Sequence, residues 1–146
     1  MRGFMKKALL LVMSVVLGSV LFGCQSSESE KEAAMQNITG TIAYRERVAL
    51  PDNAVVTVSL QDVSLMDVAA DVISTTQFET NGAQVPFNFD IEYDGSKIKP
   101  GHTYSISVRI EIDGKLRFIT DTMNAVITDE NNTQKVDLRL ISVAGQ

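Results

Sequence analysis

The sequence predicts an all-β protein: a single antiparallel β-sandwich of seven or eight strands, immunoglobulin-like or transthyretin-like, that follows a cleaved signal peptide. Two observations predict the sandwich. Apolar residues alternate with polar ones from residue 38 onward, and turn signals separate the alternating runs. A third observation, a basic and then apolar segment at the start of the chain, predicts the signal.

Residues 1–23 have the layout of an export signal. Arg2, Lys6 and Lys7 precede an apolar run from residue 8 to residue 22, and the residues after Gly23 are polar and acidic. The run of about 15 residues is shorter than the roughly 20 that a membrane-spanning helix needs. A short membrane anchor helix is the alternative interpretation of this segment.

The residues Leu21-Phe22-Gly23-Cys24 resemble the bacterial lipobox, with an aliphatic residue three positions before a cysteine and a small residue directly before it. Phe22 is bulkier than the residue usual at its position. The resemblance implies cleavage before Cys24, a diacylglycerol on its thiol and a third acyl chain on its new amino group, which together give stable anchoring. Because Gln25 follows instead of an aspartate, it also implies the periplasmic face of the outer membrane.

Cys24 is the only cysteine of the chain. Once it is acylated, the mature chain has no disulfide, thiol nucleophile or thiolate metal site. Three of the 13 basic residues belong to the signal, which leaves 10 against 18 acidic residues and a formal charge of −8. This acidity argues against binding to nucleic acid or to anionic headgroups.

The segment of residues 24–37, which begins with the lipidated cysteine, predicts a flexible tether to a domain of residues 38–143. Gln25 to Asn37 is short and polar and has no apolar period. A short helix from Ser27 to Met35 is the alternative, and an isolated helix of that length is marginal in water.

The domain contains eight predicted strands. The clearest runs from Val85 to Tyr93, where every odd position is apolar, and Pro86 belongs near its start because it cannot donate to a ladder. Asp113-Gly114 predicts a two-residue hairpin, since both positions favour positive φ. The other predicted strands are 38–44, 56–61, 72–80, 104–112, 115–120, 125–127 and 136–141.

Two connections between strands carry their own signals. Leu50 to Asn53 is a predicted turn, with Pro51 presetting its first angle. Asp62 to Ile73 is ambiguous, because Ser64 could cap a helix with Asp67 three residues later. We favour a loop here that leads into a strand at Val72, because every neighbouring segment is a strand.

No motif in the sequence indicates catalysis, a metal site or a cofactor. The one histidine, His102, follows Pro100-Gly101 in a predicted turn, where a histidine is most often exposed. The carboxylates Asp62, Asp67 and Asp71 are close in sequence and read as solvated surface. An enzyme would require a cleft that brings His102 to a carboxylate, so we predict a non-enzymatic protein.

The candidate binding residues are Tyr44, Tyr93, Arg117 and Asp121. The aromatic side chains are interpreted mainly as core, and the alternative is that some of them line a groove for an amphipathic helix or an added strand of a partner. A carbohydrate or small-ligand binder would instead expose aromatics such as Tyr44 or Tyr93. Arg117 and Asp121 are four residues apart, so they share one face of a strand.

Several segments in order resemble the YbaY family of lipoproteins. They are Gly40-Thr41-Ile42, Val48 to Ala54, Val58 to Leu65, Pro86 to Phe89 and Lys115 to Thr122, and the likeness covers nearly all of Ile38 to Val143. That family is grouped with the YscW-type pilotins of type III secretion, β-sandwich lipoproteins that escort a secretin ring subunit to the outer membrane. The resemblance implies a membrane-anchored binding module whose partner is an outer-membrane protein such as a secretin. It brings no catalytic residues, and a carbohydrate or small-ligand binder linked to envelope polysaccharide is the alternative function.

Overall fold

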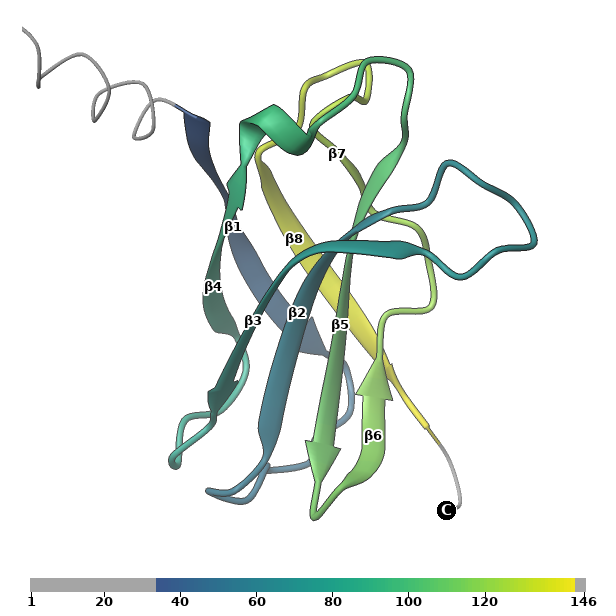
Figure 1. Cartoon of the computed structure of the whole chain (residues 1–146). Coiled ribbons are helices and arrows are strands. Elements are labelled where there is room, and N and C mark those ends of the chain that lie inside the picture. The colour runs from purple at the N-terminus through teal and green to yellow at the C-terminus, as the bar shows by residue number, and fades with distance from the viewer. Residues whose placement is uncertain (1–33, 144–146) are drawn as a thin grey trace, which may run out of the picture. The chain divides into compact units, whose positions relative to one another are not determined.

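The computed structural model of the chain describes residues 34–143. The predicted signal, the lipobox with Cys24 and most of the predicted tether lie outside these residues. The described part is all-β, as predicted (Figure 1). Its elements are β1 (Met35–Tyr44), β2 (Val55–Asp62), β3 (Asp71–Glu79), β4 (Phe87–Asp94), the 3-10 helix η1 (Gly95–Lys97), β5 (Tyr104–Ile112), β6 (Lys115–Ile119), β7 (Ala125–Val126) and β8 (Lys135–Ser142). Within this part, no helix has the length and apolar character needed to cross a membrane.

The strands follow one hydrogen-bonded path in the order β3-β2-β5-β6-β8-β1-β4, with β7 paired to β5. Every pair is antiparallel except β1 and β8, which run parallel. The prediction of a single all-β domain with seven or eight strands is therefore confirmed, and one parallel pair departs from the expected antiparallel arrangement. This pair joins the first and the last strand of the domain. The sequence did not predict it, because a contact between such distant segments has no local sequence pattern.

The sheet of residues 35–143 curls into a nearly closed barrel, because the two strands at the ends of the path, β3 and β4, meet (Figure 1). No ladder of backbone hydrogen bonds joins these two strands in the described chain. Instead, the Ser74 hydroxyl donates to the Glu92 carbonyl at 2.5 Å, and the rings of Phe78 and Phe87 lie 5.9 Å apart. Side chains thus cover two edges that would otherwise invite pairing with another chain.

The core fills the barrel with the inward residues of β1, β2, β4, β5 and β8, and β3 adds only the half-buried Ile73 and Phe78. In β4, Phe87 and Tyr93 are among the buried residues, whereas Asn88, Asp90 and Glu92 between them are exposed, as the alternation predicted. Burial of each such large apolar side chain contributes roughly 1.5–3 kcal/mol. The most deeply buried large side chains are Tyr93, Tyr104, Ile38, Ile42, Leu60, Ile91, Ile106, Ile110, Leu140, Val56, Val58 and Val108.

The predicted connections are also confirmed. Asp113 and Gly114 have φ values of 52° and 77°, which is the hairpin geometry expected between β5 and β6. At the predicted proline turn, the amide of Ala54 donates to the Pro51 carbonyl at 3.1 Å. Residues 63–70 form a loop and not a helix, and β3 follows it.

One boundary differs from the prediction. β1 begins at Met35, so residues 35–37 of the predicted tether belong to a strand. They are ordered as a strand because β4 supplies their partners, with Met35 opposite Asp94 and Gln36 opposite Tyr93. The pairing provides partners for backbone hydrogen-bonding groups of these three exposed residues, which have no apolar pattern of their own.

The parallel pairing of β1 with β8 requires a residue without a side chain at position 40. A Cβ atom on Gly40 would lie 1.7 Å from the carbonyl oxygen of Val136 in β8 and 3.0 Å from the Phe89 ring in β4. Real Cβ atoms do not approach backbone oxygens so closely, so the two strands could not keep their separation. Gly40 therefore sets the distance between β1 and β8.

We expect Gly40→Ala to lower the free energy of unfolding by about 3 kcal/mol or more, because the obstructing atom belongs to the backbone and cannot rotate away. Urea unfolding followed by circular dichroism measures the loss. Thr39→Ala, on the adjacent position of the same strand, is the control and should cost less than about 1 kcal/mol. Equal losses for the two variants would contradict the role given to Gly40.

Candidate binding groove beside strand β8

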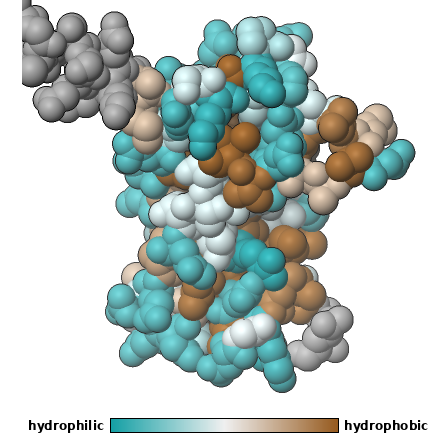
Figure 2. Space-filling view, in the orientation of Figure 1, coloured by the Kyte–Doolittle hydropathy of each residue, from teal (hydrophilic) through white to brown (hydrophobic). Residues whose placement is uncertain are grey.

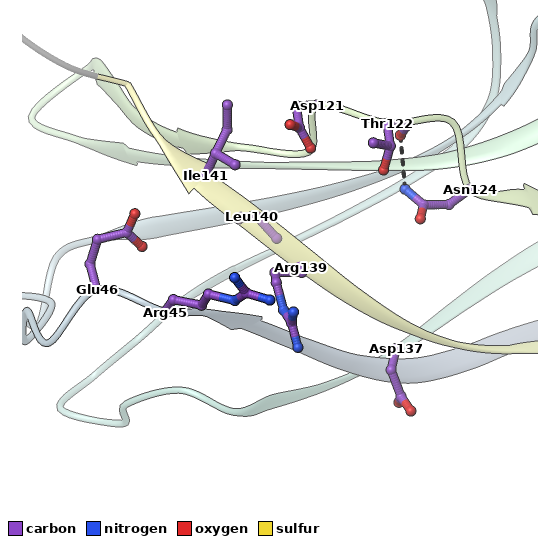
Figure 3. A pocket seen from close by; sticks show the side chains of 9 residues that line it. All are labelled: Arg45, Glu46, Asp121, Thr122, Asn124, Asp137, Arg139, Leu140 and Ile141. Carbon is purple, nitrogen blue, oxygen red and sulfur yellow. Dashed lines mark hydrogen bonds between the residues drawn. The ribbon is translucent and has the colours of Figure 1, made fainter.

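A surface cavity opens where β6 separates from β8. The two strands are paired only at Phe118–Ser142 and Ile119–Ile141, after which residues 120–124 turn away toward β7. The cavity has a volume of about 410 Å³, and Figure 3 shows the side chains that line it. It is lined by Arg45, Glu46, Asp121, Thr122, Asn124, Asp137, Arg139, Leu140 and Ile141.

Two arginines lie together in this cavity. Ala43 of β1 is opposite Arg139 of β8, and Arg45 follows the end of β1, so both side chains lie on the outer side of neighbouring strands (Figure 3). The ion pairs of residues 34–143 are His102–Asp62 and Arg109–Glu111. Within the described chain, neither guanidinium of the cavity forms an ion pair with a carboxylate, and both can donate to a ligand.

Acceptor groups line the same cavity. Glu46, Asp121 and Asp137 contribute carboxylates, and Asp137 accepts a hydrogen bond of 2.8 Å from the Thr41 hydroxyl. On the opposite wall, the side-chain amide of Asn124 donates to the backbone carbonyl of Thr122 at 3.1 Å, as the dashed line in Figure 3 shows. A lining with both cations and carboxylates suits a polypeptide segment better than a ligand of one charge sign.

An apolar cavity of about 320 Å³ adjoins the first and shares Glu46 with it. Val48, which is 57% exposed, stands at its edge, and Phe118 lies in its lining with the Tyr44 ring stacked behind it at 4.1 Å. The two cavities together are called the β8 groove below. Its second part is lined by Glu46, Val48, Ala49, Leu50, Ile112, Arg117, Phe118, Ser142 and Val143.

Two of the four candidate residues line the groove. Asp121 lies in the charged cavity and Arg117 in the apolar one. No ion pair joins them to each other or to another residue of the described chain. The residues that sequence reasoning missed are Arg45 and Arg139, because a strand pattern shows that Arg139 points outward but not that Arg45 lies beside it.

The other two candidates, Tyr44 and Tyr93, are buried in the core. Their exposed fractions are 7% and 1%, and their hydroxyls donate to the Val48 carbonyl at 2.5 Å and to the Gln36 amide oxygen at 2.9 Å. Removal from water raises the pKa of both phenols, and the charge of Glu46 adds to the effect at Tyr44. Neither ring offers a face to a ligand.

The remaining aromatic side chains of residues 34–143 are also covered. Phe87, Phe89, Tyr104 and Phe118 are buried, and Phe78 is half-buried against the core. The structure therefore has no exposed ring in its described part on which a sugar could stack. The expectation that a carbohydrate binder would expose such rings is not met.

His102 lies beside a carboxylate, which the sequence could not show. Its Nδ1 atom is 2.7 Å from Oδ2 of Asp62, whose other oxygen accepts hydrogen bonds from the Ser64 amide and hydroxyl. The Ser64 hydroxyl oxygen accepts in turn from the Thr103 amide at 2.8 Å. Because Ser64 is bonded to Asp62 and not to the imidazole, the three residues brace a loop and do not form a nucleophile with its base.

The brace changes the acidity of Asp62. Its hydrogen bonds from the Ser64 hydroxyl and from His102 lower the pKa of the carboxyl from 3.8 to about 2. The folded protein therefore favours the charged form more than the unfolded chain does. This preference stabilises the fold above about pH 4, and the contribution is lost as the pH falls from about 4 to about 2.

We therefore expect Asp62→Asn to make the acid-induced decrease in melting temperature shallower between pH 4 and pH 2, because this carboxylate can no longer take up a proton. Thermal unfolding at a series of pH values measures the difference. Asp67→Asn is the matched control, since Asp67 is exposed in the same loop, and it should keep the wild-type profile. Identical slopes for Asp62→Asn and wild type would contradict the assignment.

The small all-β domain and its mixed polar and apolar surface groove have the architecture expected of a binding module. A model of the family described as "Type III secretion system lipoprotein chaperone (YscW)" matches residues 33–140. The chain belongs to this family of lipoprotein chaperones, and its role is non-enzymatic.

Two known proteins are similar to this chain. The chain is 37% identical over 118 residues to the "Uncharacterized lipoprotein YbaY" of Escherichia coli strain K12, covering 80% of this chain and 61% of that protein. The chain thus spans somewhat less than two thirds of the length of this relative. It is 62% identical, with a TM-score of 0.75, to the solved structure of an alternative pilotin from the type II secretion system of Vibrio cholerae, over 76% of this chain and 99% of that one.

Proposed function

We propose that this protein is a pilotin-like escort: it binds a secretin-type envelope protein in the β8 groove while lipid on Cys24 holds it to the outer membrane. The observation that carries this proposal is the 62% identity to the solved chain of a pilotin from a type II secretion system, over 99% of that chain. The same likeness favours a type II secretin as the partner over the type III system in the family's description.

The β8 groove supports the binding role. Its two cavities, of about 410 and 320 Å³, adjoin one another, so one segment of a partner can contact both. Arg45 and Arg139 would hold acidic or carbonyl groups of that segment, and Val48 with the half-buried Ile112 would contact its apolar side chains. This division into a charged half and an apolar half is what an amphipathic segment requires.

The location is a second part of the proposal. The family is one of lipoproteins, and the chain carries a cysteine at position 24 after a basic and apolar segment. Acylation there would give the chain two or more acyl chains, enough for stable membrane attachment. Gln25 after the cysteine supports the outer membrane, with the domain on the periplasmic face.

We expect the double variant Arg45→Glu/Arg139→Glu to reduce the amount of crosslinked partner by about tenfold or more. The charge reversal replaces attraction between the cavity and acidic groups of the partner by repulsion. Crosslinking in intact envelopes, followed by pull-down and quantitative mass spectrometry, measures the recovery. Arg47→Glu is the control, since Arg47 is exposed and lies outside both cavities. Wild-type recovery with the double variant would exclude the charged cavity as the partner site.

Replacement of the anchor tests the escort role itself. In Cys24→Ser cells, we expect the chain to leave the outer-membrane fraction and its secretin-type partner to be mislocalised, because the carrier no longer reaches the membrane. Membrane fractionation of both proteins, beside wild type and the Arg47→Glu control, measures this. Normal localisation of every crosslinked partner in the Cys24→Ser strain would refute escort.

A further inference from the structure

The loop between β2 and β3 carries a concentration of exposed apolar side chains. Leu65, Met66 and Val68 are 70%, 87% and 63% exposed, and Val72 at the start of β3 is 57% exposed. Figure 2 shows this loop as a projecting lobe with brown and tan atoms beside the otherwise largely hydrophilic surface of that end. Exposed apolar patches of this kind mark contact surfaces.

The base of this loop is held firmly. The Val63 amide donates to the Thr103 carbonyl at 2.8 Å, and the Asp62 carboxylate binds both Ser64 and His102. The Thr128 hydroxyl in turn donates to the His102 carbonyl at 2.6 Å. The loop is therefore braced in a projecting position, and its apolar side chains do not fold back onto the core.

The loop lies at the end of the barrel where the chain enters the domain. β1 begins at Met35 at the same end at which β2 stops and β3 starts (Figure 1). Met35 is itself 42% exposed. Eleven Cα–Cα steps separate Cys24 from Met35, and even a fully extended chain of that length spans at most about 40 Å. A lipid on Cys24 would keep this end of the domain close to the bilayer.

We infer that Leu65, Met66 and Val68 insert into the surface of the phospholipid bilayer that holds the anchor, an inference that rests on the proposed lipid at Cys24. Residues 63–73 contain no lysine or arginine and do contain Asp67 and Asp71, so the loop would enter a zwitterionic surface through apolar contact and not through charge. The anchor keeps the loop at a high effective concentration near the membrane, so a small apolar contact suffices. Insertion of the loop would fix the orientation of the barrel relative to the membrane.

The chain has no tryptophan, so a single introduced one reports on its own surroundings. Lipidated Met66→Trp protein is reconstituted in vesicles of phosphatidylethanolamine and phosphatidylcholine, with and without brominated phosphatidylcholine. We expect blue-shifted emission and quenching by the brominated lipid. Met123→Trp, at a position 64% exposed outside the loop, is the matched control and should keep the emission of a ring in water.

Vesicle flotation distinguishes a failure of the proposed lipid anchor from a failure of the proposed loop insertion. Lipidated wild-type protein that does not float would refute the anchor of the proposed function. Protein that floats while Met66→Trp and Met123→Trp emit alike and escape quenching would overturn the inserted loop alone. A blue shift of Met66→Trp that appears only after a partner protein is added would also overturn it, by assigning the loop to protein docking.

Discussion

The parallel contact between β1 and β8 is the constraint on which the rest of the domain depends. It joins the first strand to the last over six residue pairs, from Thr39–Lys135 to Tyr44–Leu140, and it links β4 and β1 to the other strands. Without it the path would divide into separate pieces, neither of which would cover its own core. The missing side chain at Gly40 allows the backbones to approach this closely.

The β8 groove is a consequence of the same arrangement. β8 follows β1 for most of its length but pairs with β6 at only two residues, because β6 ends and its chain turns back toward β5. The space left between β8 and residues 120–124 is open to solvent, and the outward residues of β1 and β8 therefore line it with charge. The proposed binding site arises from this incomplete pairing, on strands whose inward residues lie in the core.

The groove and the β2–β3 loop are supported by different parts of the barrel. The groove depends on β1, β6 and β8. The loop depends instead on the hydrogen bond between Asp62, at the end of β2, and His102, just before β5. Changes in one surface need not disturb the other. This separation suits the two contacts proposed above, one with a membrane and one with a protein.

The sequence by itself determined the class of fold, the alternating face of β4 and the hairpin at Asp113-Gly114, because each depends on neighbours within a few residues. It favoured a loop after β2 only because every neighbouring segment is a strand. It also placed Arg117 and Asp121 on the surface. Only the tertiary structure decided the parallel pairing of β1 with β8, the meeting of Arg45 with Arg139 and that of His102 with Asp62. These residues are 40 or more positions apart in the sequence, so the long-range strand pairing that brings them together is not encoded in any local pattern.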